Sequence, residues 1–206
     1  MRIIAGTYRS RPLQAPAGMA TRPTSDRLRE TVFNVLTPRI EGARFLDLYA
    51  GSGAVGLEAL SRGAEHVVFV ERAAAALKAL RANLDKLGVT RGFEVHAGSV
   101  REYLRRAASG PGGFNVVFLD PPYDAEADYE GTLRTLGGAD FAPRSQMRDL
   151  AHPDSQLLAA GAVVIAEHRR KERLQESFGR LRRTRLLEQG DAGLSFYAIG
   201  TTDAGS

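Results

Sequence analysis

Short apolar runs alternate with segments of helical periodicity from residue 44 onward, and this alternation leaves few folds open to the chain. Apolar runs at residues 44–48, 66–70, 93–97, 115–119 and 162–166 predict five strands. Helical segments between strands are typical of parallel strands joined by right-handed crossovers. We therefore expect an α/β fold with a mostly parallel sheet.

The helix that follows the second predicted strand has the clearest pattern. Leu77, Leu80, Leu84 and Leu87 form one apolar stripe, and Gly88 is a natural C-terminal stop. The segment therefore predicts a helix that packs one face against the sheet.

Both ends of the chain predict antiparallel pairs. Residues 2–4 and 11–15 flank a turn-prone, arginine-bearing centre, which predicts a basic β-ribbon, and Ser25 is placed to cap a following helix. The runs at 180–187 and 194–199 predict a C-terminal hairpin. We expect an N-terminal arm (1–24), one α/β domain (25–200) and a disordered tail (201–206). The connection at 137–155 has no clear period.

Composition narrows the classes of protein that the chain can belong to. It has 206 residues and no cysteine, which removes disulfides and thiolate chemistry. No apolar run approaches the roughly 18 residues of a membrane span, and the first residues lack the apolar core of a secretory signal. The four histidines are scattered without ligand spacing, so no metal site is expected. We expect a cytoplasmic protein that does not contact a membrane.

The positive charge is concentrated near the two ends of the chain. The net charge is +4, and arginines dominate both the first thirty residues and residues 169–185. Guanidinium groups suit phosphate, which favours a nucleic-acid partner. Charged faces that serve solubility alone remain the alternative.

A glycine loop follows the first predicted strand. Gly51, Gly53 and Gly56 have the G-x-G-x-x-G spacing of dinucleotide sites, and Glu71 lies at the end of the next strand. Asp47 argues against a dinucleotide, because its carboxylate would oppose a pyrophosphate at the helix N-terminus. The cationic S-adenosylmethionine suits an acidic edge, and Glu71 can accept from its ribose hydroxyls. A turn needed only for close helix packing is the alternative.

The second motif, Asp120-Pro121-Pro122-Tyr123, follows the fourth predicted strand at the sheet edge where α/β proteins bind ligands. The exocyclic amine of a nucleic-acid base is a weak nucleophile until its nitrogen is pyramidalised. Asp120 and the Pro121 carbonyl can accept its two N–H bonds and aim the lone pair at a methyl donor. Tyr123 can stack on the base, which must lie outside a helix. A rigid proline turn is the alternative.

These motifs together resemble the 16S ribosomal RNA guanine-N2 methyltransferases of the RsmD type. The resemblance runs through residues 2–6, 22–27, 47–64, 69–71 and 120–123. It implies a single Rossmann-like methyltransferase domain with a seven-stranded sheet. The implied monomeric enzyme uses S-adenosylmethionine, releases S-adenosylhomocysteine, and methylates 16S rRNA or the assembling small ribosomal subunit.

The resemblance also assigns roles to individual residues. The run 97–100 lacks the acidic or amide side chain that many relatives offer to adenine, and Ser99 or the Val100 amide could substitute for it. The catalytic group is Asp120, Pro121 and Tyr123; the cofactor group is Asp47, Tyr49, Gly51, Ser52, Gly53, Glu71, Ser99 and Val100; and the RNA-binding group is Arg2, Arg9, Arg11, Arg22, Thr24 and Arg27.

Three other functions remain open at this level. DNA adenine-N6 and cytosine-N4 methyltransferases use the same Asp-Pro-Pro-Tyr chemistry, but they usually carry a sizeable target-recognition region. Protein glutamine methyltransferases generally have Asn in place of Asp120. A non-catalytic RNA-binding assembly factor could lose the glycine loop or Asp120, and this chain keeps both.

Overall fold

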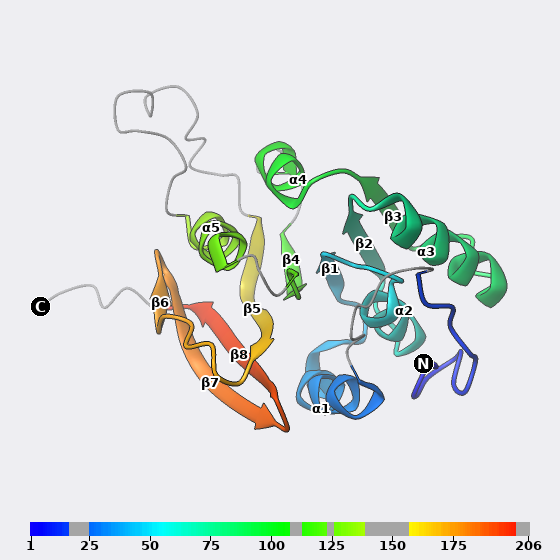
Figure 1. The fold of residues 1–206 in the computed structure, drawn as a ribbon, viewed down its shortest axis with the longest axis horizontal. Helices are drawn as coiled ribbons and strands as arrows, with labels where there is room; N and C mark the ends of the chain where they lie inside the picture. Colours follow the sequence, from blue (N-terminus) through cyan, green and yellow to red (C-terminus); the bar gives the residue numbers. More distant parts are fainter. Residues whose placement is uncertain (17–24, 108–112, 123–125, 139–156, 201–206) are drawn as a thin grey trace, which may run out of the picture.

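The computed structural model describes residues 1–16, 25–107, 113–122, 126–138 and 157–200 (Figure 1). The helices are α1 (Asp26–Leu36), a 3-10 turn η1 (Thr37–Arg39), α2 (Ala54–Ser61), α3 (Ala74–Leu87), α4 (Val100–Ala107) and α5 (Glu126–Leu136). The strands are β1 (Arg44–Leu48), β2 (His66–Glu71), β3 (Phe93–Ala97), β4 (Phe114–Leu119), β5 (Leu158–Arg169), β6 (Ser177–Phe178), β7 (Leu181–Gln189) and β8 (Ala192–Ile199).

All the described strands belong to one sheet in the order β3-β2-β1-β4-β5-β8-β7-β6. The first five are parallel, and β8, β7 and β6 pair antiparallel at the end of the sheet. The expected α/β fold with a C-terminal antiparallel hairpin is confirmed. The expected count of seven strands is wrong, because the described sheet has eight. The additional strand, β6, is two residues long and too short to produce a periodic pattern.

Two apolar layers enclose the sheet. Side chains of α1, α2 and α3 form one core with Phe45, Phe69 and Phe118. Side chains of α4 and α5 form the other with residues such as Leu48 and Leu119. Figure 1 shows α4 and α5 on one side of the sheet and α1 and α2 on the other. Alternate residues of each central strand therefore face different helices.

The N-terminal segment pairs with itself less extensively than a β-ribbon would. One isolated antiparallel bridge joins Arg2 to Pro12. Further backbone hydrogen bonds run from Ile3 N to Arg11 O at 3.0 Å and from Leu13 N to Met1 O at 3.1 Å. Ile3 and Leu13 are buried in the same core as α2, so the segment is attached to the domain. We call residues 1–16 the N-terminal segment below.

The local signals at α1 and β5 are confirmed and extended. Ser25 caps α1 by accepting a hydrogen bond from Leu28 N at 3.1 Å, and the helix ends two residues before Pro38. Strand β5 is longer than the expected 162–166, reaching Arg169. Residues 17–24, 139–156 and 201–206 lie outside the described parts, including most of the 137–155 connection and the expected tail. In the described parts, no helix is both long and apolar enough to cross a bilayer.

Candidate active site

Four carboxylates lie at the carboxyl ends of four neighbouring strands. Asp47 of β1 is in register with Phe69 of β2 and Phe118 of β4, and Phe118 is in register with Ile165 of β5. These three partners all pack in the core on the α1–α3 side.

Two residues further along, on the same face, come Glu71, Asp120 and Glu167. Asp47, Glu71, Asp120 and Glu167 are called the carboxylate cluster below. Glu167 was not predicted, because a lone acidic residue at the end of an apolar strand carries no motif. Strand alternation and register could have revealed it.

Asp47 lies deepest in the cluster. Its side chain is buried, and Oδ2 accepts a hydrogen bond from Gly56 N of α2 at 2.8 Å. Burial raises the pKa of Asp47 to about 7, the Gly56 hydrogen bond opposes that rise, and the charge of Glu71 adds to it. A negative charge here is costly without a cation, and a cationic ligand would reduce the cost.

The structure explains the presence of glycine at the three loop positions in different ways. A Cβ on Gly53 would collide with Leu80 of α3, and one on Gly56 would collide with the Phe69 ring. These two glycines therefore allow α2 to pack closely. Gly51 has a φ of +57°, and a Cβ there would meet nothing within 4 Å. Close helix packing, the alternative for the whole loop, thus explains Gly53 and Gly56. It does not explain Gly51, which has open space beside it.

Glu71 fixes the glycine loop to the end of β2. Its Oε2 accepts from Gly51 N at 2.8 Å, and its Oε1 accepts from Arg72 N and Ala73 N at 2.8 and 2.7 Å. The side chain is only partly buried. It therefore sets the loop conformation and keeps an accessible carboxylate at the position predicted to bind ribose.

Asp120 follows β4 within the carboxylate cluster. Burial raises the pKa of Asp120 well above its ordinary value, and the charges of Glu167 and Asp47 raise it further. Pro121 is buried and Pro122 is exposed. Tyr123 lies outside the described residues. The structure thus brings Asp120 close to Asp47, the residue predicted to line the cofactor site, and leaves the stacking role of Tyr123 a prediction.

The remaining predicted cofactor residues occupy the loops after β1 and β3. Tyr49 has a φ of +62°, and its hydroxyl lies 3.0 Å from Thr132 Oγ1 of α5. Ser99 Oγ accepts from Glu102 N at 3.2 Å, so its hydroxyl caps α4. Val100 is the first residue of that helix. Of the pair predicted to contact adenine, the Val100 amide is therefore the better placed, and both assignments stay predictions.

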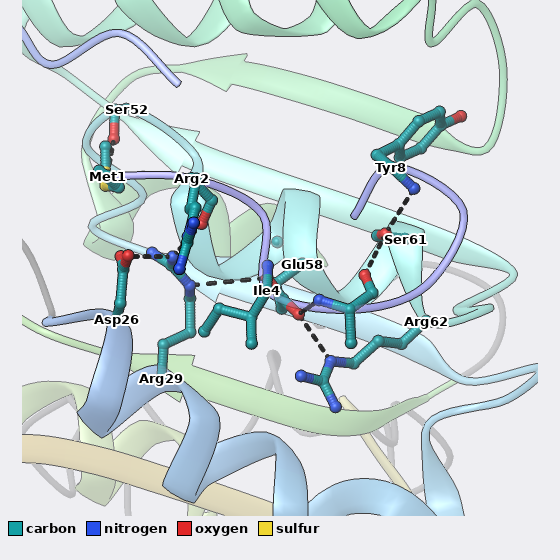
Figure 2. Close-up of polar contacts among 12 residues, drawn as sticks. Met1, Arg2, Ile4, Tyr8, Asp26, Arg29, Ser52, Glu58, Ser61 and Arg62 are labelled. Carbon is teal, nitrogen blue, oxygen red and sulfur yellow. Dashed lines mark hydrogen bonds and ion pairs between the residues drawn. The ribbon is translucent and has the colours of Figure 1, made fainter. Parts of the chain in front are cut away.

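Glu58 of α2 attaches the N-terminal segment to the domain (Figure 2). This fully buried carboxylate accepts from Ile4 N at 2.7 Å and Ala5 N at 3.0 Å, and it pairs with Arg62 Nε at 2.7 Å. The buried Arg29 of α1 contacts it at 3.7 Å and donates to the Arg2 carbonyl. The segment is therefore held by charge-assisted hydrogen bonds to a helix that starts at the glycine loop.

Asn83 of α3 joins the N-terminal segment directly to that loop, a connection that sequence reasoning missed. Its Oδ1 accepts from Gln14 N at 2.7 Å, and its Nδ2 donates to Gln14 O and Ser52 O, each at 3.0 Å. The Ser52 hydroxyl lies 4.0 Å from Met1 Sδ (Figure 2). Ser52 is thus oriented toward the N-terminal segment, and its contact with the cofactor stays a prediction.

The predicted RNA-binding residues fall into two groups. Arg2, Arg9 and Arg11 are exposed on the N-terminal segment, and Arg27 is exposed at the start of α1. Arg22 and Thr24 lie outside the described residues. Within the described parts, no three acidic or histidine side chains group as a metal site would require. Ile3 and Leu13 anchor the N-terminal segment in the core on the α1–α3 side, the face from which the carboxylate cluster projects.

The family model described as "Conserved hypothetical protein 95" matches residues 1–198. The chain belongs to this family. It is 37% identical to "Putative rRNA methyltransferase YlbH" of Bacillus subtilis over 96% of this chain and 98% of that protein. It is 43% identical to "Ribosomal RNA small subunit methyltransferase D" of Haemophilus influenzae over 60% of this chain and 64% of that protein.

A solved structure also matches almost throughout. The structure described as "Putative methyltransferase yhhF from Escherichia coli" has a TM-score of 0.75 and 33% identity, covering 96% of both chains. The resemblance to the RsmD-type family is therefore confirmed, and so is the methyltransferase-like α/β fold.

Replacing Asp47 with Asn should stabilise the protein without added cofactor, and more so at high pH. The pKa of Asp47 is raised to about 7, so its contribution to stability is greatest at acid pH and is lost as pH rises through 7. Asn keeps an acceptor for Gly56 N and carries no charge. Urea unfolding of both proteins should show a larger gain at pH 8 than at pH 5. A gain independent of pH, or one matched by the exposed-site variant Asp85→Asn, would contradict this account.

Replacing Asn83 with Ala should loosen the N-terminal segment and the glycine loop together, because one side chain bonds to both. Hydrogen exchange should quicken in residues 1–16 and 49–56, which can be measured by mass spectrometry. Asn34→Ala, at an exposed position on α1, is the matched control. Faster exchange in one region alone would show that the two are independent.

Proposed function

We propose that the protein transfers a methyl group from S-adenosylmethionine to the exocyclic N2 amine of a guanine in 16S ribosomal RNA. The observation that carries the proposal is the position of Asp120 beside Asp47, at the carboxyl ends of adjacent strands β4 and β1. In the proposed arrangement, an acceptor for the target amine lies next to the site expected to hold the cation. The names of the relatives as rRNA methyltransferases support the choice of RNA.

The residues present fit the cofactor on chemical grounds. S-adenosylmethionine supplies a methyl group attached to a positively charged sulfur. Asp47 offers a carboxylate whose charge is unfavourable without a cation, and Glu71 offers oxygens that can accept from ribose hydroxyls. Beside Gly51 there is open space for a ligand to approach the backbone. A pyrophosphate would instead meet both acidic groups.

On the acceptor side, Asp120 and the Pro121 carbonyl hold the two N–H bonds of the guanine amine. This pyramidalises the nitrogen and directs its lone pair toward the methyl carbon. The amine forms the new N–C bond as the C–S bond breaks and the sulfur takes the electron pair. The Asp120 carboxylate accepts the proton that the amine loses, and the raised pKa of Asp120 favours this transfer.

On the RNA side, the exposed arginines of the N-terminal segment contact backbone phosphates. Such contacts orient the RNA without reading its sequence. Arg2, Arg9 and Arg11 are exposed, and Glu58 and Asn83 hold the segment that carries them on the domain. The target guanine must be unstacked to reach Asp120, since a paired amine cannot approach the methyl donor.

Replacing Asp120 with Ala should greatly slow methyl transfer while cofactor binding persists. The purified protein, given tritium-labelled S-adenosylmethionine and small subunits from cells that lack the enzyme, should label 16S rRNA as N2-methylguanosine. Asp120→Ala should reduce the rate by roughly 100-fold or more, and Asp85→Ala should leave it unchanged. Because Asp120 acts as an acceptor and its pKa is raised, kcat/KM of the unaltered protein should fall as pH is lowered.

Labelled DNA with unlabelled rRNA would reject the proposal in favour of a DNA amino-methyltransferase. Full activity of Asp120→Ala would reject the assigned chemistry.

The double variant Arg9→Ala with Arg11→Ala should bind RNA more weakly and with a shallower salt dependence. Two lost phosphate contacts should reduce the slope of log affinity against log salt by roughly 1.4 to 1.8. Filter binding of 16S rRNA over a series of NaCl concentrations measures the slope. Arg105→Ala with Arg106→Ala, on α4 at the opposite side of the sheet, is the matched control. If the double variant and the unaltered protein had equal slopes, Arg9 and Arg11 would serve solubility and not RNA binding.

A further inference from the structure

A cavity of about 680 Å³ lies where the carboxyl end of β5 meets α1 and the β7–β8 turn. Ser25 and Leu28 of α1 form one wall, and the segment that follows β5 forms another. A volume of this size is within the range of small-molecule and nucleotide sites, about 300–1,000 Å³. The lining of this cavity contains none of the residues predicted to bind the cofactor, and it contains neither Asp120 nor Pro121.

The cavity has two chemically different regions. Glu167, which is 4% exposed, lines it as a buried carboxylate. Arg170, Lys171 and Arg173 line it as exposed cations, which outnumber the one exposed acid of the lining, Asp191. An acidic group inside and basic groups at the exposed side match a nucleotide whose base edge donates hydrogen bonds and whose phosphate is negative.

Glu167 belongs to both the cavity and the carboxylate cluster. Leu119 of β4 and Ala166 of β5 are in register, so Asp120 and Glu167 are the next residues on adjacent strands, which lie about 4.8 Å apart. The Tyr129 hydroxyl of α5 donates to the Glu167 carbonyl at 2.7 Å and fixes the backbone there. This register places the two carboxylates near each other, and the charge of Glu167 adds to burial in raising the pKa of Asp120.

We propose that this cavity takes the target guanine nucleotide and that Glu167 selects guanine by accepting its N1–H. Guanine presents N1–H and the N2 amine side by side, so one base edge can meet two neighbouring carboxylates. Asp120 accepts from the amine that reacts, and Glu167 accepts from the adjacent ring nitrogen. Adenine has a bare lone pair at N1, which would face the Glu167 carboxylate and be rejected.

The cations on the exposed side of the cavity complete the site. Lys171 and Arg173 contact the phosphates that flank the unstacked nucleotide, while Arg170 pairs with Glu188 at 3.1 Å and covers the turn. The arginines after β5, for which charge alone allowed a solubility role, thereby acquire a binding role. This inference rests on the proposed function, because it names the residue that reads the base to be methylated.

The test compares Glu167→Gln with Glu176→Gln, a matched control whose side chain is 88% exposed. Methyl transfer to 16S rRNA gives kcat/KM, and titration with S-adenosylmethionine checks that each variant folds and binds cofactor. Independently of methylation, binding of GMP and of 2-aminopurine riboside monophosphate is measured by NMR with S-adenosylhomocysteine present. The second nucleotide keeps the N2 amine and lacks the N1 proton.

Glu167→Gln should lower kcat/KM for RNA roughly 10- to 100-fold, the loss expected for one base-reading contact. Cofactor affinity should be unchanged. The preference for GMP over the 2-aminopurine nucleotide should shrink, because the Gln amide can donate to a bare N1. The acid limb of the pH profile should move to lower pH, because a negative charge near Asp120 has been removed.

Two failures can be told apart. If the unaltered protein labels RNA and Glu167→Gln behaves as Glu176→Gln does, the inference is overturned and the proposed function stands. If the unaltered protein labels no RNA, the proposed function fails, and the nucleotide preferences alone decide whether Glu167 reads guanine. Equal binding of the two nucleotides by the unaltered protein would also overturn the inference.

Discussion

The register of four parallel strands is the constraint on which the candidate site depends. β2, β1, β4 and β5 are aligned so that each ends in a carboxylate on the same face. Because side chains alternate along a strand, a slip of one residue in any pair would move one acid to the opposite face. Two residues before Glu71 and Asp120, the buried Phe69 and Phe118 favour this register by packing in the core shared with α1, α2 and α3.

Concentrating acids in one place is unfavourable in the absence of a cation. Burial raises the pKa of both Asp47 and Asp120, and each is raised further by a neighbouring carboxylate. Groups with strongly shifted pKa values cluster at functional sites, where ligand binding offsets their cost. The cluster therefore makes this edge of the sheet suited to a positively charged ligand, which would offset the cost of the buried acids.

The sequence predicted the central fold and the residues of two motifs, because both depend on local patterns. Apolar periodicity located the first four strands to within a residue at each end, and spacing identified Asp47, Glu71 and Asp120. It missed β6, which is two residues long, and it overestimated the regularity of the N-terminal segment. Glu167 and Asn83 were missed because their significance comes from residues far away in the chain, which a single sequence does not bring together.

The three hydrogen bonds of Asn83 have a thermodynamic consequence. Gln14 and Ser52 are bound by the same buried amide, so ordering of the basic N-terminal segment and ordering of the glycine loop cannot be energetically independent. Such linkage is reciprocal. If nucleic acid bound to the N-terminal segment raises the affinity of the glycine loop for its ligand, that ligand must raise the affinity for nucleic acid by the same factor. The Asn83 side chain thereby provides one structural connection through which binding at either region would change affinity at the other.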